Sequence, residues 1–71
     1  GRRYSMKAAE ARKLIGKPVV WMDTYCAKRG YFQREGVLLA VNGRNVCIDQ
    51  FGSNDWKWLP DLVGFKEKDA E

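Results

Sequence analysis

The amino-acid sequence predicts a single, mainly β domain with a short N-terminal helix, and three observations lead to this prediction. The chain has 71 residues, a length that suits one domain. A helix-forming segment occurs only near the start, and from Pro18 onward short apolar runs alternate with Gly, Asn and Pro turn signals. Three Trp, three Tyr and three Phe supply large side chains for the core of so short a chain. We therefore expect one domain over residues 1–71.

The first expected element is a helix over residues 5–16. Ser5 is a favourable N-cap, residues 6–15 contain strong helix formers, and Gly16 followed by Pro18 ends the helix. Residues 1–4 are expected to form a flexible arm. The helical spacing places one apolar stripe toward the rest of the domain, made of Ala8, Ala11, Leu14 and Ile15.

Residues 19–22 read as a strand that is covered on both faces, because all four are β-branched, aromatic or large and apolar. Residues 23–35 are mainly polar. We expect them to form a long loop whose second half can pair as a strand.

A central hairpin is the clearest local signal. Residues 36–41 and 44–51 are apolar-rich, and Asn42 and Gly43 between them favour a two-residue type I′ turn. That turn pairs Val41 with Arg44 and places two sets of side chains on opposite faces. The expected core face holds Val37, Leu39, Val41, Val46 and Ile48. The expected outer face holds Leu38, Ala40, Asn45, Cys47 and Asp49.

Two further strands complete the expected fold. A turn at residues 52–54 precedes a strand over residues 55–59, which Pro60 ends because proline cannot donate to the ladder. A tight turn leads to a short last strand over residues 63–65, and residues 66–71 are expected to be a frayed, charged tail.

Three stretches of the sequence carry a resemblance to known small barrels. Residues 36–49 (GVLLAVNGRNVCID) are similar to the central hairpin of Sm-like domains, and residues 14–19 are similar to their helix-to-strand junction. Residues 58–63 (WLPDLV) are similar to the strand, 3₁₀ turn and strand that end SH3-like domains. The resemblance implies a small five-stranded SH3-like or Sm-like barrel over residues 18–65.

The sequence also departs from both families. The polar RNA-binding signatures of Sm-like rings are absent around Asn42 and Gly43, so ring assembly is not implied. The acidic ligand loop of signalling SH3 domains is absent too, since residues 23–34 are net basic, and recognition of Pro-rich peptides is not implied.

The formal net charge of +4 is unevenly distributed. Residues 1–44 hold ten basic and three acidic residues, a balance of +7, whereas residues 45–71 hold three basic and six acidic ones, a balance of −3. Basic side chains interleaved with aromatic ones suit nucleic acid, because cations contact phosphates and rings stack on bases. The alternative is that these are ordinary solvated surface charges whose uneven distribution along the chain is due to chance.

From this distribution we expect a non-enzymatic module that binds RNA or DNA with little sequence preference. The residues expected to form the nucleic-acid site are Lys28, Arg29, Tyr31, Arg34, Arg44, Arg12 and Lys13. Tyr25, Phe32, Arg2 and Arg3 are expected to add to it.

A protein-interaction surface is the alternative function. It would dock on a larger assembly through Trp56, Trp58 and Leu38, beside Ala40, and self-association through a barrel edge is a variant of it. The same tryptophans with Trp21 and Phe51 would suit an aromatic cage. Since Trp56 and Trp58 share one face of a strand, we expect at least one of them to be buried.

The composition argues against catalysis, cofactors and metals. The chain has no histidine, and Cys26 and Cys47 are too few for a zinc site. Cys47 reads as a small buried hydrophobe, and the sequence does not establish a disulfide between the two. The acidic residues Asp23, Asp49, Asp55 and Asp61 all fall at expected strand ends or turns, where Asp bonds to the local backbone.

Localisation and assembly follow from what the sequence lacks. No run approaches the roughly 20 apolar residues of a membrane span, and the start does not resemble a secretory signal. We expect a cytoplasmic protein without a membrane partner, present as a monomer or a small homo-oligomer.

Overall fold

A computed structural model of the chain describes residues 6–23 and 32–69. Within these two ranges, five antiparallel strands and one short α-helix confirm the mainly β class. The elements follow one another along the chain as α1 (Ala8–Arg12), β1 (Pro18–Asp23), β2 (Phe32–Asn42), β3 (Asn45–Gln50), β4 (Ser53–Trp58), the 3₁₀ turn η2 (Leu59–Asp61) and β5 (Val63–Glu67).

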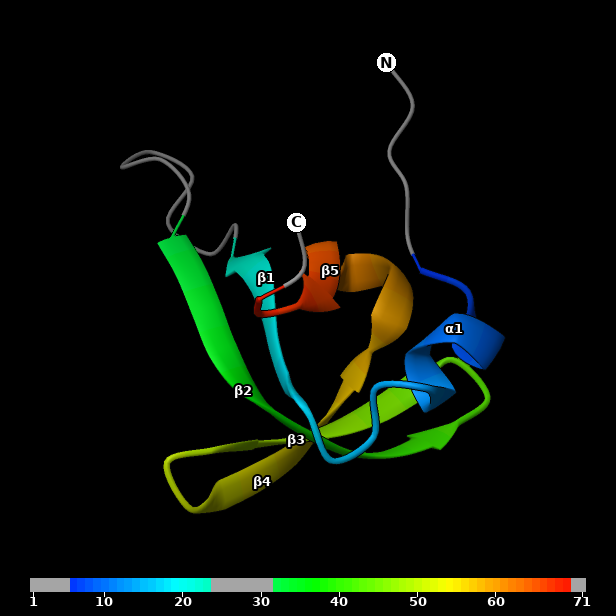
Figure 1. The fold of residues 1–71 in the computed structure, drawn as a ribbon, viewed down its shortest axis with the longest axis horizontal. Helices are drawn as coiled ribbons and strands as arrows, with labels where there is room; N and C mark the ends of the chain where they lie inside the picture. The colour runs from blue at the N-terminus through cyan, green and yellow to red at the C-terminus, as the bar shows by residue number, and fades with distance from the viewer. Residues whose placement is uncertain (1–5, 24–31, 70–71) are drawn as a thin grey trace.

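The strands form one sheet in the order β4-β3-β2-β1-β5. The sheet is strongly curved but it is not closed, because β4 and β5 are its two edges within the described ranges (Figure 1). The long strand β2 pairs with β1 through its first half and with β3 through its second half. Val37 belongs to both halves, because it lies opposite Pro18 on one side and opposite Asp49 on the other.

Helix α1 is shorter than expected and is followed by a turn that ends at Gly16 (φ +88°). Lys7 stands at the N-cap, where its backbone N–H donates to Glu10 Oε1 at 3.1 Å, while Ser5 lies outside the described residues. The Gly16 N–H donates to the carbonyl oxygen of Leu38 at 2.7 Å, which ties the end of the helical segment to β2.

The core lies inside the curve of the sheet. Trp21 and Phe65 both belong to it, and their ring centroids lie 6.5 Å apart. The helix contributes Ala11, with Leu14 packed against the cluster, whereas Ile15 is exposed and does not dock as expected. The buried core cluster is Ala11, Val19, Trp21, Leu38, Val46, Ile48, Leu59, Leu62 and Phe65.

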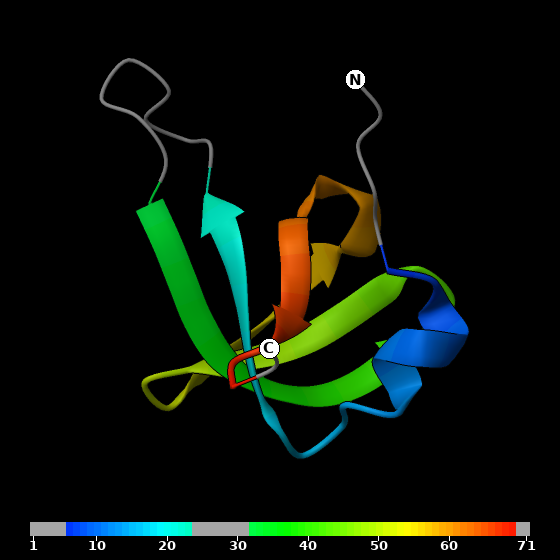
Figure 2. The same cartoon turned by 45° about the horizontal axis from the view of Figure 1, so that its top comes forward.

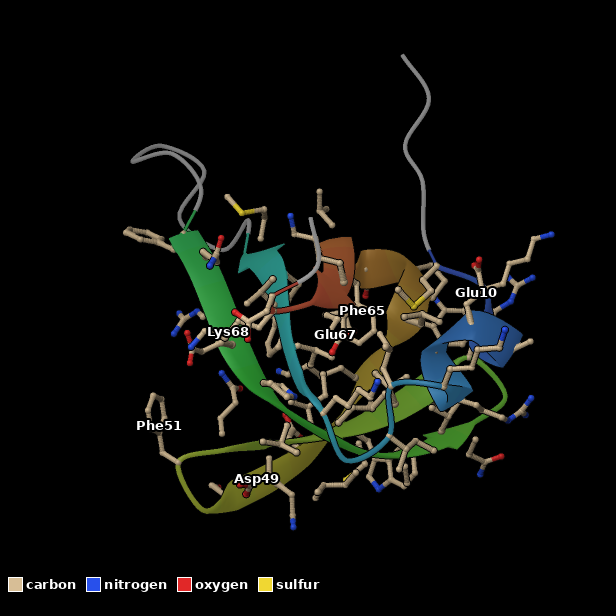
Figure 3. All side chains as sticks on the ribbon, viewed as in Figure 1. Glu10, Asp49, Phe51, Phe65, Glu67 and Lys68 are labelled. Atoms are coloured by element: carbon tan, nitrogen blue, oxygen red, sulfur yellow. The ribbon has the colours of Figure 1, made fainter. Side chains whose placement is uncertain are left out.

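Strand β1 is buried on both faces, as the sequence predicts. Val19 and Trp21 belong to the core, and Val20 between them is buried too. The end of β5 extends past the expected strand, and the expected frayed tail is partly ordered. Lys66 and Glu67 belong to β5, and Lys68 Nζ contacts Glu35 Oε2 at 3.1 Å (Figure 3).

Both tight turns differ from the expected ones. Asn42 pairs with Asn45, so the β2–β3 turn is Gly43 and Arg44 rather than Asn42 and Gly43. Only Gly43 has a positive φ there (+62°), whereas a type I′ turn needs it at both central positions. That condition is met in the β3–β4 turn, where Phe51 (φ +55°) and Gly52 (φ +85°) connect the pair Gln50 and Ser53.

The structure contains, in the part of the chain that it describes, no helix with the length and apolar character needed to cross a bilayer.

Candidate interaction surface

The sheet formed by the second half of β2, β3 and β4 has one side that faces away from the core, and we call it the outer face. On β3, Val46 and Ile48 are buried in the core, so that Asn45, Cys47 and Asp49 point to the outer face. This is the alternation expected from the sequence for β3.

The structure confirms the expected faces of Ala40 and Val41 on β2. The expected faces of Val37, Leu38 and Leu39 are wrong, because a β-bulge changes the register between Leu38 and Ala40. Leu38 lies opposite Ile48 and is fully buried, whereas Leu39 is 40% exposed. The bulge inserts one extra residue, so that Leu38 and Val41 both turn to the core although they are three residues apart. Leu38 is therefore not part of an interaction surface, and the exposed leucine is Leu39.

Strand β4 has charged residues on its inner side and tryptophans on its outer side. Asp55 and Lys57 lie opposite the buried Ile48 and Val46, respectively. Trp56 and Trp58 lie opposite Cys47 and Asn45 on the outer face. Their exposed fractions are 52% and 45%, so the expectation that at least one is buried is wrong.

The inward position of Lys57 is compatible with a core because of its long side chain. Its ammonium group lies 5.8 Å from the centroid of the Trp21 ring and 3.7 Å from Asp55 Oδ2. The aliphatic stem covers the rim of the core while the charge stays partly in solvent. Lysine thus takes the place on β4 that an apolar side chain would otherwise occupy.

The outer face combines these three strands into one apolar surface. Ala40, Cys47 and Trp56 form one row across β2, β3 and β4, and Asn42, Asn45 and Trp58 form the next row. Cys47 is a free thiol and is half-buried between its neighbours rather than inside the core. The apolar members of the outer face are Val37, Leu39, Ala40, Cys47, Trp56 and Trp58.

Phe51 occupies the tip of the β3–β4 turn and is 97% exposed. Figure 3 shows its side chain extending away from the body of the domain. Trp21 faces the core, the two exposed tryptophans face outward, and Phe51 lies at the turn. The expected aromatic cage of these four residues is therefore not formed.

The expected basic site is divided in the structure. Arg12 and Lys13 follow one another at the end of α1, and Arg44 is in the β2–β3 turn, which lies beside α1 in both views (Figures 1 and 2). Arg34 lies opposite Trp21 in the other half of β2. The extended chain between Arg34 and Arg44 is about 30 Å long when measured along the strand. Arg34 interacts within the protein, and all four side chains are exposed.

Of the remaining residues expected in the basic site, only Phe32 belongs to the described part of the chain. Lys28, Arg29, Tyr31 and Tyr25 lie outside the described residues, as do Arg2, Arg3 and Cys26. Phe32 begins β2 and is exposed, at the same end of the sheet as Arg34.

Other chemistry is sparse in the described ranges. No group of three or more Cys, Asp or Glu there has a metal-binding arrangement. A pocket of about 270 Å³ lies between β1, β2 and β5, and it is lined by Val20, Trp21, Met22, Gln33, Gly64 and Lys66. Among the described residues that line it, Gln33 and Lys66 have polar side chains and none is acidic.

Comparison of the chain with protein-family models, with curated proteins and with solved structures found no match.

Proposed function

We propose that the chain is a non-enzymatic protein-interaction module that docks on another protein through its outer face. The observation that carries the proposal is the orientation of β4, which turns Trp56 and Trp58 to solvent and Asp55 and Lys57 toward the core. Burial of the tryptophans would stabilise the fold more than their exposure does, since each has a large apolar surface area. Their exposure therefore needs a reason other than stability.

The composition of the outer face also supports a protein partner. Two half-exposed tryptophans share this face with aliphatic side chains, with Leu39 at 40% exposure, and none of the Lys and Arg residues that the structure describes belongs to it. Contiguous exposed apolar surface is typical of protein interfaces, and Trp is among the residues that contribute most to their affinity. The asparagines and Asp49 at the margins supply the polar rim that such interfaces have.

Phe51 adds an independent argument. A phenylalanine with φ +55° occupies a backbone region that is unfavourable for residues with a Cβ, and its side chain makes almost no contact with its own chain. Phe51 therefore contributes nothing apparent to folding. We propose that it is a second anchor, inserted by the β3–β4 turn into a pocket of the partner.

A pair of β2 variants tests the docking surface. Leu39→Asp places a charge on the outer face, and Gln33→Asp places the same charge in the other half of β2, where the side chain is also exposed. Tagged wild type and both variants are used to capture proteins from extracts of the cells that make the chain, and the captured proteins are purified for titration calorimetry. We expect one partner to bind wild type and Gln33→Asp equally and to lose binding to Leu39→Asp. Equal binding of the three chains would reject this surface.

Nucleic-acid binding is the second candidate, and one arrangement favours it. Arg12 and Lys13 lie at the end of α1, beside the β2–β3 turn that holds Arg44 (Figures 1 and 2). The Leu59 N–H donates to the Arg44 carbonyl, which places Trp58 beside that turn. Three cations and one stacking ring can hold a few nucleotides of single-stranded nucleic acid. We rank this candidate second because the larger apolar part of the outer face is unsuited to phosphates.

The order of the strands and the 3₁₀ turn at Leu59–Asp61 support a relationship to SH3-like and Sm-like domains, which we propose at the level of the fold.

A further inference from the structure

Strand β4 is at one end of the sheet. It pairs with β3 along one edge, and no strand in the described ranges pairs with its other edge. It runs through six consecutive pairs with β3 without a bulge, and every residue except Lys57 is exposed. The opposite edge, β5, is less regular, with a register shift against β1 and a positive φ at Gly64. Regular, uncovered edges are templates for pairing with another strand.

The hydrogen-bond pattern shows which backbone groups of β4 are available. The Leu59 N–H donates to the Arg44 carbonyl at 2.7 Å, which makes Arg44 and Leu59 a hydrogen-bonded pair. Because the two kinds of pair alternate in an antiparallel ladder, Lys57 and Asp55 bond to β3. The N–H and C=O groups of Trp58, Trp56 and Asn54 therefore point to the free edge.

We infer that a second copy of the chain pairs antiparallel with β4, with a two-fold axis at Trp56. In this register Trp56 of each copy exchanges two backbone hydrogen bonds with Trp56 of the other, and Asn54 pairs with Trp58 in the same way. Asp55 then lies opposite Lys57 of the other copy, and the symmetry makes this pair twice. Both side chains are on the inner side of β4, so oppositely charged groups meet directly.

The charges of Asp55 and Lys57 favour this register over the registers that are shifted along the strand. A shift that centres the axis on Lys57 places two lysines opposite each other, and one that centres it on Asp55 places two aspartates opposite each other. A shift by a single residue places the free backbone groups of one copy opposite residues of the other copy whose backbone groups already bond to β3. Strand β4 is thus complementary to itself in one register, which favours a second copy over an unrelated peptide at this edge.

The pairing would join the outer faces of the two copies, with the Trp56 side chains side by side at the axis. The inference goes beyond the proposed docking function and does not depend on it, since it concerns backbone groups and the inner side of β4. So short an interface implies a weak dimer, formed at high protein concentration.

Two single variants that reverse the charge, Asp55→Lys and Lys57→Asp, and the double variant that combines them test the dimer in the purified chain. Sedimentation equilibrium should show reversible dimerisation of wild type, and Asp55→Lys should weaken it about tenfold or more because two attractions become repulsions. Asp55 is suitable because its side chain is 71% exposed. The double variant Asp55→Lys/Lys57→Asp should recover wild-type affinity, and a mixture of the two single variants should form a heterodimer.

Hydrogen exchange provides a test that needs no variant. The Trp56 amide should exchange more slowly as the protein concentration rises, whereas the Asp55 and Lys57 amides, already bonded to β3, should not change. A wild type that stays monomeric at millimolar concentration, or a dimer that Asp55→Lys leaves intact, would overturn the inference. Loss of partner binding by Leu39→Asp, which lies away from this edge, is a separate result and reports only on the docking function.

Discussion

A Cβ atom added to Gly36 would lie 2.5 Å from Cγ2 of Ile48. It would also lie 2.7 Å from the carbonyl oxygen of Asp49, which belongs to the backbone of β3. Gly36 lies opposite Val19, one residue before β2 passes from its pairing with β1 to its pairing with β3. The absence of a side chain therefore allows β2 to bend closely over β3, and this bend gives the sheet its two halves.

Gly36→Ala should lower the free energy of unfolding by about 1–3 kcal/mol, as overpacking of a close contact does. Gly43→Asn is the control, because nothing lies within 4 Å of a Cβ there and Asn tolerates the φ of +62°. Urea unfolding of both variants measures the difference. A midpoint for Gly36→Ala equal to that of wild type would show that the bend does not depend on this contact.

Leu38 and Leu39 form a matched pair that tests the β-bulge. Leu38→Ala should cost about 2–5 kcal/mol of stability because the side chain is fully buried. Leu39→Ala should cost less than about 1 kcal/mol, since Leu39 lies on the outer face. Thermal unfolding followed by circular dichroism compares them. The reverse order of the two costs is what an unbulged hairpin requires, and it would remove Leu39 from the docking surface.

Phe51→Asn should raise the stability of the isolated chain by about 1 kcal/mol, because Asn tolerates positive φ better than Phe. The same substitution should weaken binding to a partner captured through the outer face. Chemical denaturation and titration calorimetry measure the two effects. A loss of stability would mean that Phe51 supports the fold in a way that its exposure does not show.

Single-stranded oligonucleotides test the second candidate function. If Arg12, Lys13 and Arg44 each neutralise one phosphate, the logarithm of the binding constant should fall against that of salt concentration with a slope near −2. Arg44→Glu should then abolish binding, with Lys66→Glu on β5 as the matched control. Fluorescence anisotropy at several salt concentrations makes the measurement. Tight binding that salt does not weaken would exclude a phosphate-based site.

Local signals predicted the elements of the fold but not all of their faces. The strand from Pro18 and the turn at Pro60 depend on residues whose effect is local, and the structure confirms them. The expected helix end at Gly16 is wrong, because α1 ends at Arg12 and a turn continues to Gly16. The faces of β2 depend on the bulge at Leu39, which changes the side-chain parity by one residue. That bulge belongs to the curvature of the whole sheet, and neither Leu38 nor Leu39 signals it.

The candidate interaction surface could be predicted only in part. The sequence indicated that Trp56 and Trp58 share a face, and the structure agrees. It did not indicate which face, because the expectation that large aromatic residues fill a small core favoured burial. The inner side of β4 is instead taken by Lys57, whose stem reaches the rim of the core near Trp21. Asp55 and Lys57 are the residues of the sequence that indicate this orientation. Opposite charges at positions i and i+2 lie on the same side of a strand, where they can form an ion pair even on the inner side.

Site-specific photo-crosslinking decides whether a partner protein binds the outer face. A photoreactive phenylalanine analogue replaces Leu39 on the outer face or, as the control, Gln33 in the other half of β2, in the cells that make the chain. We expect an adduct with one partner protein from position 39 that is absent from position 33 and is lost when Trp58→Ser is added. Equal adducts from both positions, or an adduct only from position 33, would show that the outer face is not the docking surface.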